Sequence, residues 1–197
     1  AGLRFHRTSR FGQEDNTIAV SGSLPLTPSI GISGEIAYSP THHVLPENAL
    51  AGGMSHSFPG GWGVAAQVRY SHYSNSSSIS FPVTVEKYLS NWRLAYTISH
   101  SHGNTTGNAL NHRGQISYYF SDESSINLMY SNGDELEKAE SADEVIITAS
   151  EGLALWGQFT LTPDLTFFYG GGYTRLRRDN GFAAHRDRLG IGLRFYF

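Results

Sequence analysis

The amino-acid sequence predicts an all-β fold: a closed antiparallel transmembrane β-barrel of about twelve strands. Three observations predict it. Apolar residues alternate with polar or very small ones along most of the chain, most clearly at its end, where Leu189, Ile191, Leu193, Phe195 and Phe197 are separated by Gly, Arg and Tyr. Short turn signals recur at nearly even spacing. Glycines and aromatic residues are abundant, yet no run approaches the ~20 apolar residues of a membrane helix. Large apolar side chains on one face and polar ones on the other are typical of strands between lipid and a watery lumen.

Composition limits the classes of function. The 197 residues suffice for a single domain, 1–197, and the net charge of −3 gives no electrostatic support for nucleic-acid binding. The absence of cysteine excludes disulfides and thiolate metal sites. Mean hydropathy is −0.30, as expected when half of each strand faces water. We expect no cofactor. Ala1 could follow a cleaved leader, or the chain could be the barrel part of a longer protein.

Five short turns divide the chain. They centre on Pro28, Gly60, Asn91, Asp122 and Pro163, with spacings of 32, 31, 31 and 41 residues. Gly, Pro, Asn and Asp supply the backbone angles of tight hairpins. Each interval holds two strands and one longer polar loop. The expected loops are 8–15, 39–47, 73–78, 101–108, 132–144 and 177–186. This alternation predicts twelve strands with both termini on the short-turn side, which in bacterial barrels is the periplasmic side.

Alternation also assigns the face of each side chain, because neighbouring residues of a strand point to opposite sides. In chain order, the residues expected to face lipid are Ile30, Ile32, Ile36 and Tyr38; Trp62, Val64, Ala66, Val68 and Tyr70; Phe81, Val83 and Val85; Trp92, Leu94, Tyr96 and Ile98; Ile116, Tyr118 and Phe120; and the odd positions 189–197. A lysine or arginine on this face at mid-depth would cost ~2–4 kcal/mol, so the register is well determined.

The opposite face carries the candidate luminal residues. They are Arg4, His6, Glu35, Gln67, Arg69, Glu86, Tyr88, Arg93, Arg113, Gln115, Gln158, Arg188, Arg194 and Tyr196. Arginines with a few carboxylates can bind an anionic saccharide or select anions, since guanidinium groups match carboxylates. Alternatively, these charges pair with one another across a narrow lumen and only stiffen the wall. The sequence leaves both interpretations open.

A second chemistry is suggested by His72-Tyr73-Ser74-Asn75, with Glu86 further along. The segment resembles the His-x-Ser-Asn motif of outer-membrane phospholipase A and of lipid A deacylases, in which histidine activates serine and a third residue orients the histidine. His72 and Ser74 share the lipid-facing parity of Tyr70, whereas Glu86 has the luminal parity. A lipid-facing serine hydrolase is therefore an alternative function.

Other charged clusters have simpler interpretations. The acidic run Asp134, Glu135, Glu137, Lys138, Glu140, Asp143 and Glu144 lacks EF-hand spacing, so we expect a solvated loop rather than a calcium site. The pairs His42/His43 and His100/His102 lie at loop edges, and we expect no metal site there. Arg175, Arg177, Arg178, Arg186 and Arg188 flank the last loop, where they would meet lipopolysaccharide phosphates or hydrate the rim.

Three segments resemble the YaiO family of outer-membrane barrels. They are Val68-Arg69-Tyr70 through Tyr73; Glu86-Lys87-Tyr88-Leu89 with Asn91-Trp92-Arg93-Leu94; and Tyr119-Phe120 through Tyr130-Ser131-Asn132-Gly133-Asp134-Glu135. The resemblance covers roughly residues 50–197. It implies a barrel often encoded beside exopolysaccharide machinery, with no catalytic residues to transfer. The terminal Phe197 also resembles the assembly signal of outer-membrane proteins.

Together these features predict a non-enzymatic barrel of the bacterial outer membrane, in contact with lipids and lipopolysaccharide. Its expected role is a channel or secretion-associated pore for a solute such as an anionic saccharide or exopolysaccharide. The alternatives are the serine hydrolase and a structural barrel with a filled interior.

Overall fold

The computed structural model describes residues 1–10, 13–138, 145–177 and 183–195. These residues form twelve β-strands, which confirms the predicted all-β class and strand number. The strands are β1 (Gly2–Arg10), β2 (Gln13–Pro25), β3 (Ile30–Tyr38), β4 (Asn48–Phe58), β5 (Trp62–His72), β6 (Ser77–Leu89), β7 (Trp92–Gly103), β8 (Gly107–Ser121), β9 (Ser124–Lys138), β10 (Val145–Thr162), β11 (Leu165–Arg177) and β12 (Ala183–Phe195). No helix of the described residues is long and apolar enough to cross a membrane.

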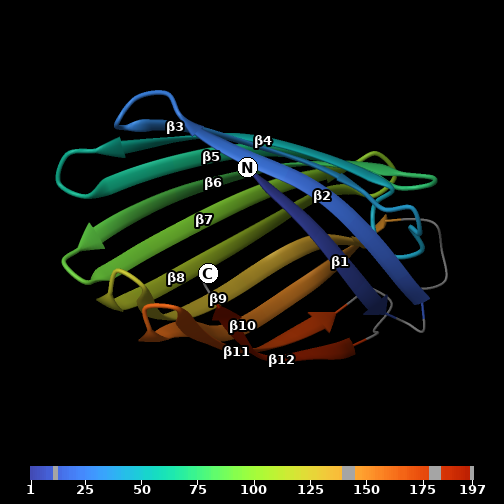
Figure 1. Ribbon diagram of the computed structural model, residues 1–197. Helices are drawn as coiled ribbons and strands as arrows, with labels where there is room; N and C mark the ends of the chain where they lie inside the picture. Colours follow the sequence, from blue (N-terminus) through green and yellow to red (C-terminus); the bar gives the residue numbers. More distant parts are fainter. Residues whose placement is uncertain (11–12, 139–144, 178–182, 196–197) are drawn as a thin grey trace.

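The strands follow one another in a single sheet in sequence order, each antiparallel to its neighbours. The sheet curls around a central space (Figure 1). β1 begins and β12 ends at the edge of the sheet that carries the short turns, as predicted for both termini. β1 and β12 are the two ends of the strand order, and within the described ranges no backbone pairing joins them.

All five short turns lie where the sequence predicts them. Residues 59–61 join β4 to β5, and here Gly60 and Gly61 have φ of 77° and 79°, a left-handed conformation that glycine adopts at little cost. Ser90 takes the same conformation, with φ of 52°, between β6 and β7. These tight connections place each following strand beside the preceding one and so fix the hairpin register.

The predicted loop 39–47 coincides with the connection between β3 and β4, but other predicted loops are too long. β1 and β2 continue into the predicted loop 8–15, β7 and β8 leave only 104–106 unpaired, and β9 continues through the acidic run to Lys138. A polar sequence does not end an antiparallel ladder, because the backbone pairs remain satisfied when the side chains enter water. Residues 11–12, 139–144 and 178–182, which include Glu140, Asp143, Glu144 and Arg178, lie outside the described residues.

Large apolar side chains cover the outside of the sheet, as the alternation predicts. Trp62, Val64, Ile98 and Phe195 are 50%, 37%, 38% and 57% exposed, so none of them is packed in a dry centre. The most buried residues on the inner face are small or polar, such as Ala19, Ala51 and Ser117. Exposed apolar surface of this extent is stable only in contact with lipid, so the faces are those of a membrane barrel.

Near the short turns, the outer surface carries a row of aromatic rings. Ring centroids are 4.7 Å apart for Trp92 and Tyr118, 4.9 Å for Tyr118 and Phe120, and 5.3 Å for Phe120 and Phe159. The row continues from Phe159 to Tyr169. Aromatic rings of this kind gather where a barrel leaves the hydrocarbon layer, so the row marks the short-turn membrane interface.

Candidate functional site

The inner face of the sheet holds a carboxylate shared by two arginines. Glu35 of β3 accepts hydrogen bonds from Arg4 of β1 at 3.0 Å and from Arg69 of β5 at 2.9 Å. Its side chain is only 18% exposed, whereas those of Arg4 and Arg69 are 66% and 40% exposed. Each arginine has five N–H donors and is partly exposed, so both retain donors beyond those that Glu35 accepts.

A second ion pair lies on the inner face near the short turns. The Arg93 Nε donates to Glu86 Oε2 at 2.7 Å, and the two residues come from adjacent strands, β7 and β6. The inward-facing rings of Tyr88 and Tyr119 border the same end, where with Asn91 they line a hollow of about 440 Å³. Two predicted luminal charges are therefore brought together here and neutralise each other.

Between these pairs, the inner wall encloses a central hollow of about 740 Å³. Most of the side chains around it are small, from serine, glycine, alanine and threonine residues of β2 to β8, with Gln67 and Arg113 among the larger ones. Arg113 is exposed, and among the residues that the structure describes it has no ionic or hydrogen-bonding partner. The central hollow thus contains space for a solute and an uncompensated positive charge.

The central hollow continues into two smaller ones. It shares Ser23, Ser33 and Gln67 with a hollow of about 340 Å³. That hollow shares Glu35 and Arg69 with a third, of about 360 Å³, which reaches the connection between β3 and β4 and is called the loop hollow below. These shared residues connect the hollows along the inner face of β1 to β8.

The remaining luminal candidates lie apart from these groups. Gln115 donates to Ser117, and Gln158 donates to the carbonyl oxygen of Glu123 at the short-turn rim. The Arg194 guanidinium stacks 4.5 Å from the Phe168 ring centroid, and Arg188 lies opposite Gly172 in the β11–β12 register. His6 lines the loop hollow. Tyr196 is outside the described residues.

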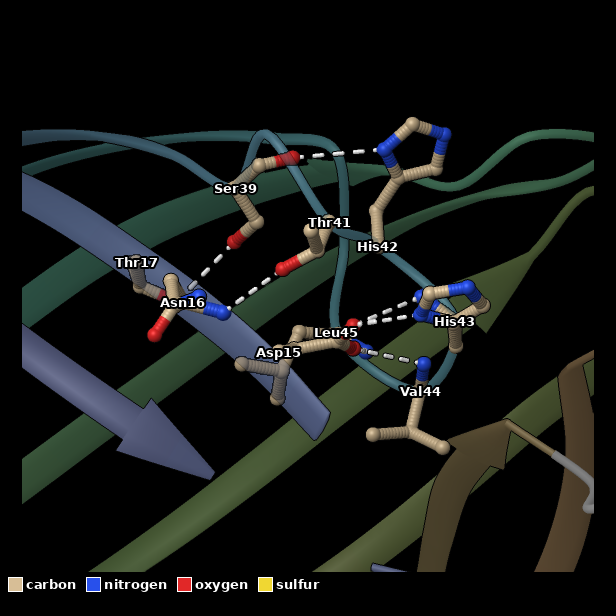
Figure 2. A network of polar contacts seen from close by, with 9 residues as sticks. All are labelled: Asp15, Asn16, Thr17, Ser39, Thr41, His42, His43, Val44 and Leu45. Carbon is tan, nitrogen blue, oxygen red and sulfur yellow. Dashed lines mark hydrogen bonds and ion pairs between the residues drawn. The ribbon is translucent and has the colours of Figure 1, made fainter. Parts of the chain in front are cut away.

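Sequence reasoning missed two inner-face residues. Trp156 shares the parity of Gln158 and faces inward opposite Gly170, although a tryptophan amid leucines suggests a lipid-facing position. Asp15 was expected in an exposed loop but is fully buried on β2. As Figure 2 shows, its carboxylate accepts from the backbone N–H groups of His43, Val44 and Leu45 at 2.7–2.9 Å. His43, expected to be an unremarkable loop residue, also contacts Asp15 through its ring Nδ1 at 3.0 Å.

The structure separates the residues of the hydrolase alternative. His72 pairs with Ser77 at the start of β6, whereas Glu86 pairs with Gly63 near the other end of that strand. The nine positions from Ser77 to Glu86 span about 30 Å of strand. The Glu86 carboxylate also forms an ion pair with Arg93. A triad of His72, Ser74 and Glu86 is therefore wrong, because a catalytic acid must lie within hydrogen-bond reach of its histidine.

The described part of the chain contains no group of three or more histidine or acidic side chains that could hold a metal ion. His100 and His102 lie within β7 rather than in a loop, and the His102 ring is 3.0 Å from Asn108 Oδ1. The outer rim includes a hollow beside Glu151, Arg175 and Arg177.

Comparison with known proteins supports the barrel assignment. A family model described as the YaiO membrane beta barrel domain matches residues 2–136, so the similarity includes the N-terminal strands and ends in β9, unlike the 50–197 expected from short motifs. No curated protein sequence matches the chain.

Several solved structures share the fold. A KdgM porin in complex with disordered oligogalacturonate has a TM-score of 0.58 and 11% identity, with 99% of this chain and 98% of that chain covered. A NanC porin has a TM-score of 0.57 and 14% identity over 99% and 98%. OmpT, an outer-membrane protein of Vibrio cholerae, gives 0.52 and 9% over 99% and 79%. At these identities the likeness concerns the fold.

Proposed function

Because this chain belongs to the YaiO membrane β-barrel family and is a barrel of the bacterial outer membrane, we propose that its inner face forms a channel for anionic saccharides. The observation that carries the proposal is the central hollow of about 740 Å³ with the unpaired Arg113 beside it. A filled structural barrel would need large side chains in this position, and the wall there is formed mostly by small ones.

The charge of the inner face favours anions. Six arginines of the candidate luminal set, namely Arg4, Arg69, Arg93, Arg113, Arg188 and Arg194, accompany Glu35 and Glu86 of the same set and the buried Asp15. Glu35 and Glu86 are already bound by arginines, and Asp15 is bound by backbone N–H groups of residues 43–45. In a narrow lumen with a low-dielectric wall, the surplus positive charge raises the local concentration of anions and lowers that of cations.

Aromatic residues on the inner face suit a sugar. Tyr88, Tyr119, Trp156 and Phe168 all have the inward parity of their strands. Flat apolar rings can lie against the C–H faces of pyranose rings, while guanidinium groups bind the carboxylates of acidic sugars. The solved KdgM porin, which shares the fold, is described with bound oligogalacturonate, a polymer of this chemical class.

Reversal-potential measurements in planar lipid bilayers test the proposal. The wild-type protein should pass chloride in preference to potassium across a KCl gradient. Arg113→Ala should lower the anion preference by about twofold, because the unpaired charge lies in the conducting space. Arg175→Ala is the matched control, since Arg175 has the outward parity of Tyr173. Absence of conductance, or a cation-selective wild type, would overturn the proposal.

A further inference from the structure

The connection between β3 and β4, residues 39–47, folds onto the inner wall of the sheet. β2 starts at Gln13, but its pairing with β3 begins only at Ile18 and Tyr38. The connection takes the place of β3 beside the unpaired part of β2, where the Asn16 backbone N–H donates to Thr41 Oγ1 at 2.8 Å. Its base is closed by the Ser39 N–H and the Glu47 carbonyl oxygen, 2.8 Å apart.

Asp15 holds the middle of this connection against the wall. Its Oδ1 accepts from the His43 backbone, and its Oδ2 accepts from the backbones of Val44 and Leu45. Asp15 has no exposed surface, and Val44 is only 6% exposed. A buried carboxylate is stable only when its oxygens are satisfied, and here three consecutive N–H groups and the His43 ring satisfy them. The position of residues 43–45 therefore depends on Asp15.

The held connection completes the loop hollow. Arg4, Arg69 and Glu35 form its charged side, while Leu45 and Pro46 from the connection form an apolar side. The volume of about 360 Å³ is that of one or two sugar rings rather than a polymer. A guanidinium pair with spare donors facing an apolar surface matches a pyranose that carries a carboxylate.

We infer that the loop hollow is a binding subsite for a carboxylated sugar unit, and that Asp15 is a positioning residue that keeps Leu45 and Pro46 in place to complete it. The inference rests on the proposed channel function and identifies the loop hollow as the place where the channel recognises its saccharide. Arg4 and Arg69 bind the carboxylate with the N–H groups that Glu35 leaves free. Leu45 and Pro46 contact the sugar ring. Asp15 touches no sugar and acts only through the connection.

Block of single-channel current by added saccharide tests the inference. Trigalacturonate is the anionic probe, and maltotriose is the neutral one. Asp15→Asn replaces one acceptor oxygen with a donor, which releases residues 43–45 and leaves the subsite complete only part of the time. The concentration of trigalacturonate for half-block should rise about tenfold, because apparent affinity falls with the fraction of binding-competent molecules. Block by maltotriose, which lacks the carboxylate, should be weak and change little.

Glu14→Gln is the matched control, because Glu14 is the adjacent carboxylate and pairs with Arg7 on the opposite face of the hairpin. It should leave the half-block concentration unchanged. Leu45→Ala, which keeps Asp15 intact, should weaken block about threefold by removing apolar contact. Heat-modifiable gel migration shows whether each variant folds. If Asp15→Asn does not fold, Leu45→Ala still tests whether the connection contributes to saccharide binding in the loop hollow.

The outcomes separate the two proposals. An anion-selective channel that trigalacturonate does not block, or that it blocks equally in wild type, Asp15→Asn and Leu45→Ala, overturns the subsite and leaves the channel standing. A protein without anion-selective conductance overturns both. Weaker block in the Asp15 and Leu45 variants, with Glu14→Gln unchanged, supports the subsite.

Discussion

Glu35 holds two arginines in a fixed arrangement on the inner wall. Its oxygens lie 3.0 and 2.9 Å from the guanidinium groups of Arg4 and Arg69, which belong to strands two positions away on either side. Because both arginines are more than one third exposed, the pairs contribute little to stability, and their main effect is on the potential inside the barrel. Glu35 cancels part of that positive potential.

Glu35→Gln should therefore make the channel more selective for anions. Loss of one negative charge between two arginines should raise the chloride-to-potassium permeability ratio by about twofold, measured from reversal potentials in a KCl gradient. Glu151→Gln serves as the control, since Glu151 accepts from Tyr130 on the outside of the sheet. An unchanged or lower ratio in Glu35→Gln would mean that Glu35 does not face the conducting path.

Residue identity and parity were enough to predict which charges face inward, but not how they meet. Glu35 lies level with Ala51 and, one strand further, with Arg69, whereas Arg4 lies level with Ala19, two residues from the Ser21 that pairs with Glu35. Both arginines reach Glu35 across an intervening strand because their side chains are long. Asp15 could not be predicted, because its burial depends on where the connection between β3 and β4 folds. In the sequence, Asp15 is simply an acidic residue between Glu14 and Asn16, which does not distinguish it from an exposed loop residue.

At the level of the strands, alternation determines which side of each element meets lipid. Val85 of β6 points outward and pairs with Tyr96 of β7, midway between Trp92 at the short-turn interface and His100 toward the opposite rim. Its neighbour Thr84 points inward, lines the central hollow and is 2.8 Å from Thr97. Strand ends were less predictable, because hairpins continue into water for as long as backbone pairing continues.

An arginine should strongly destabilise the folded barrel at position 85 and have little effect on its stability at position 84. Val85→Arg should lower the free energy of unfolding by ~2–4 kcal/mol, because the guanidinium group would lie in hydrocarbon near the membrane centre. Thr84→Arg places the same group in the hydrated interior, where the cost should be below about 1 kcal/mol. Urea unfolding in phospholipid vesicles measures both values. Equal destabilisation by the two variants would contradict the assigned faces.

For the molecule as a whole, the decisive feature is the seam between the first and last strands. The outward side chains there are unusually exposed, with Phe5 at 71% and Ile191 at 79%, because neither strand has a neighbour on that side within the described residues. In a bilayer, each unpaired backbone group would cost several kcal/mol. We therefore expect β1 to pair with β12 in the membrane, which would close the barrel that the family description names.

Parity restricts the register of that seam. Leu3 and Phe5 face outward on β1, as do Leu193 and Phe195 on β12, so outward residues must pair with outward residues. Aligning the two short-turn ends sets Leu3 opposite Phe195 and Phe5 opposite Leu193.

A short thiol cross-linker should join Phe5→Cys to Leu193→Cys in outer-membrane vesicles, because directly opposed Cβ atoms lie about 4.5–5.5 Å apart. Phe5→Cys with Gly192→Cys should not react, since position 192 faces the lumen. Efficient cross-linking of that control pair, or a failure of both pairs to react, would show that β1 and β12 do not pair in this register.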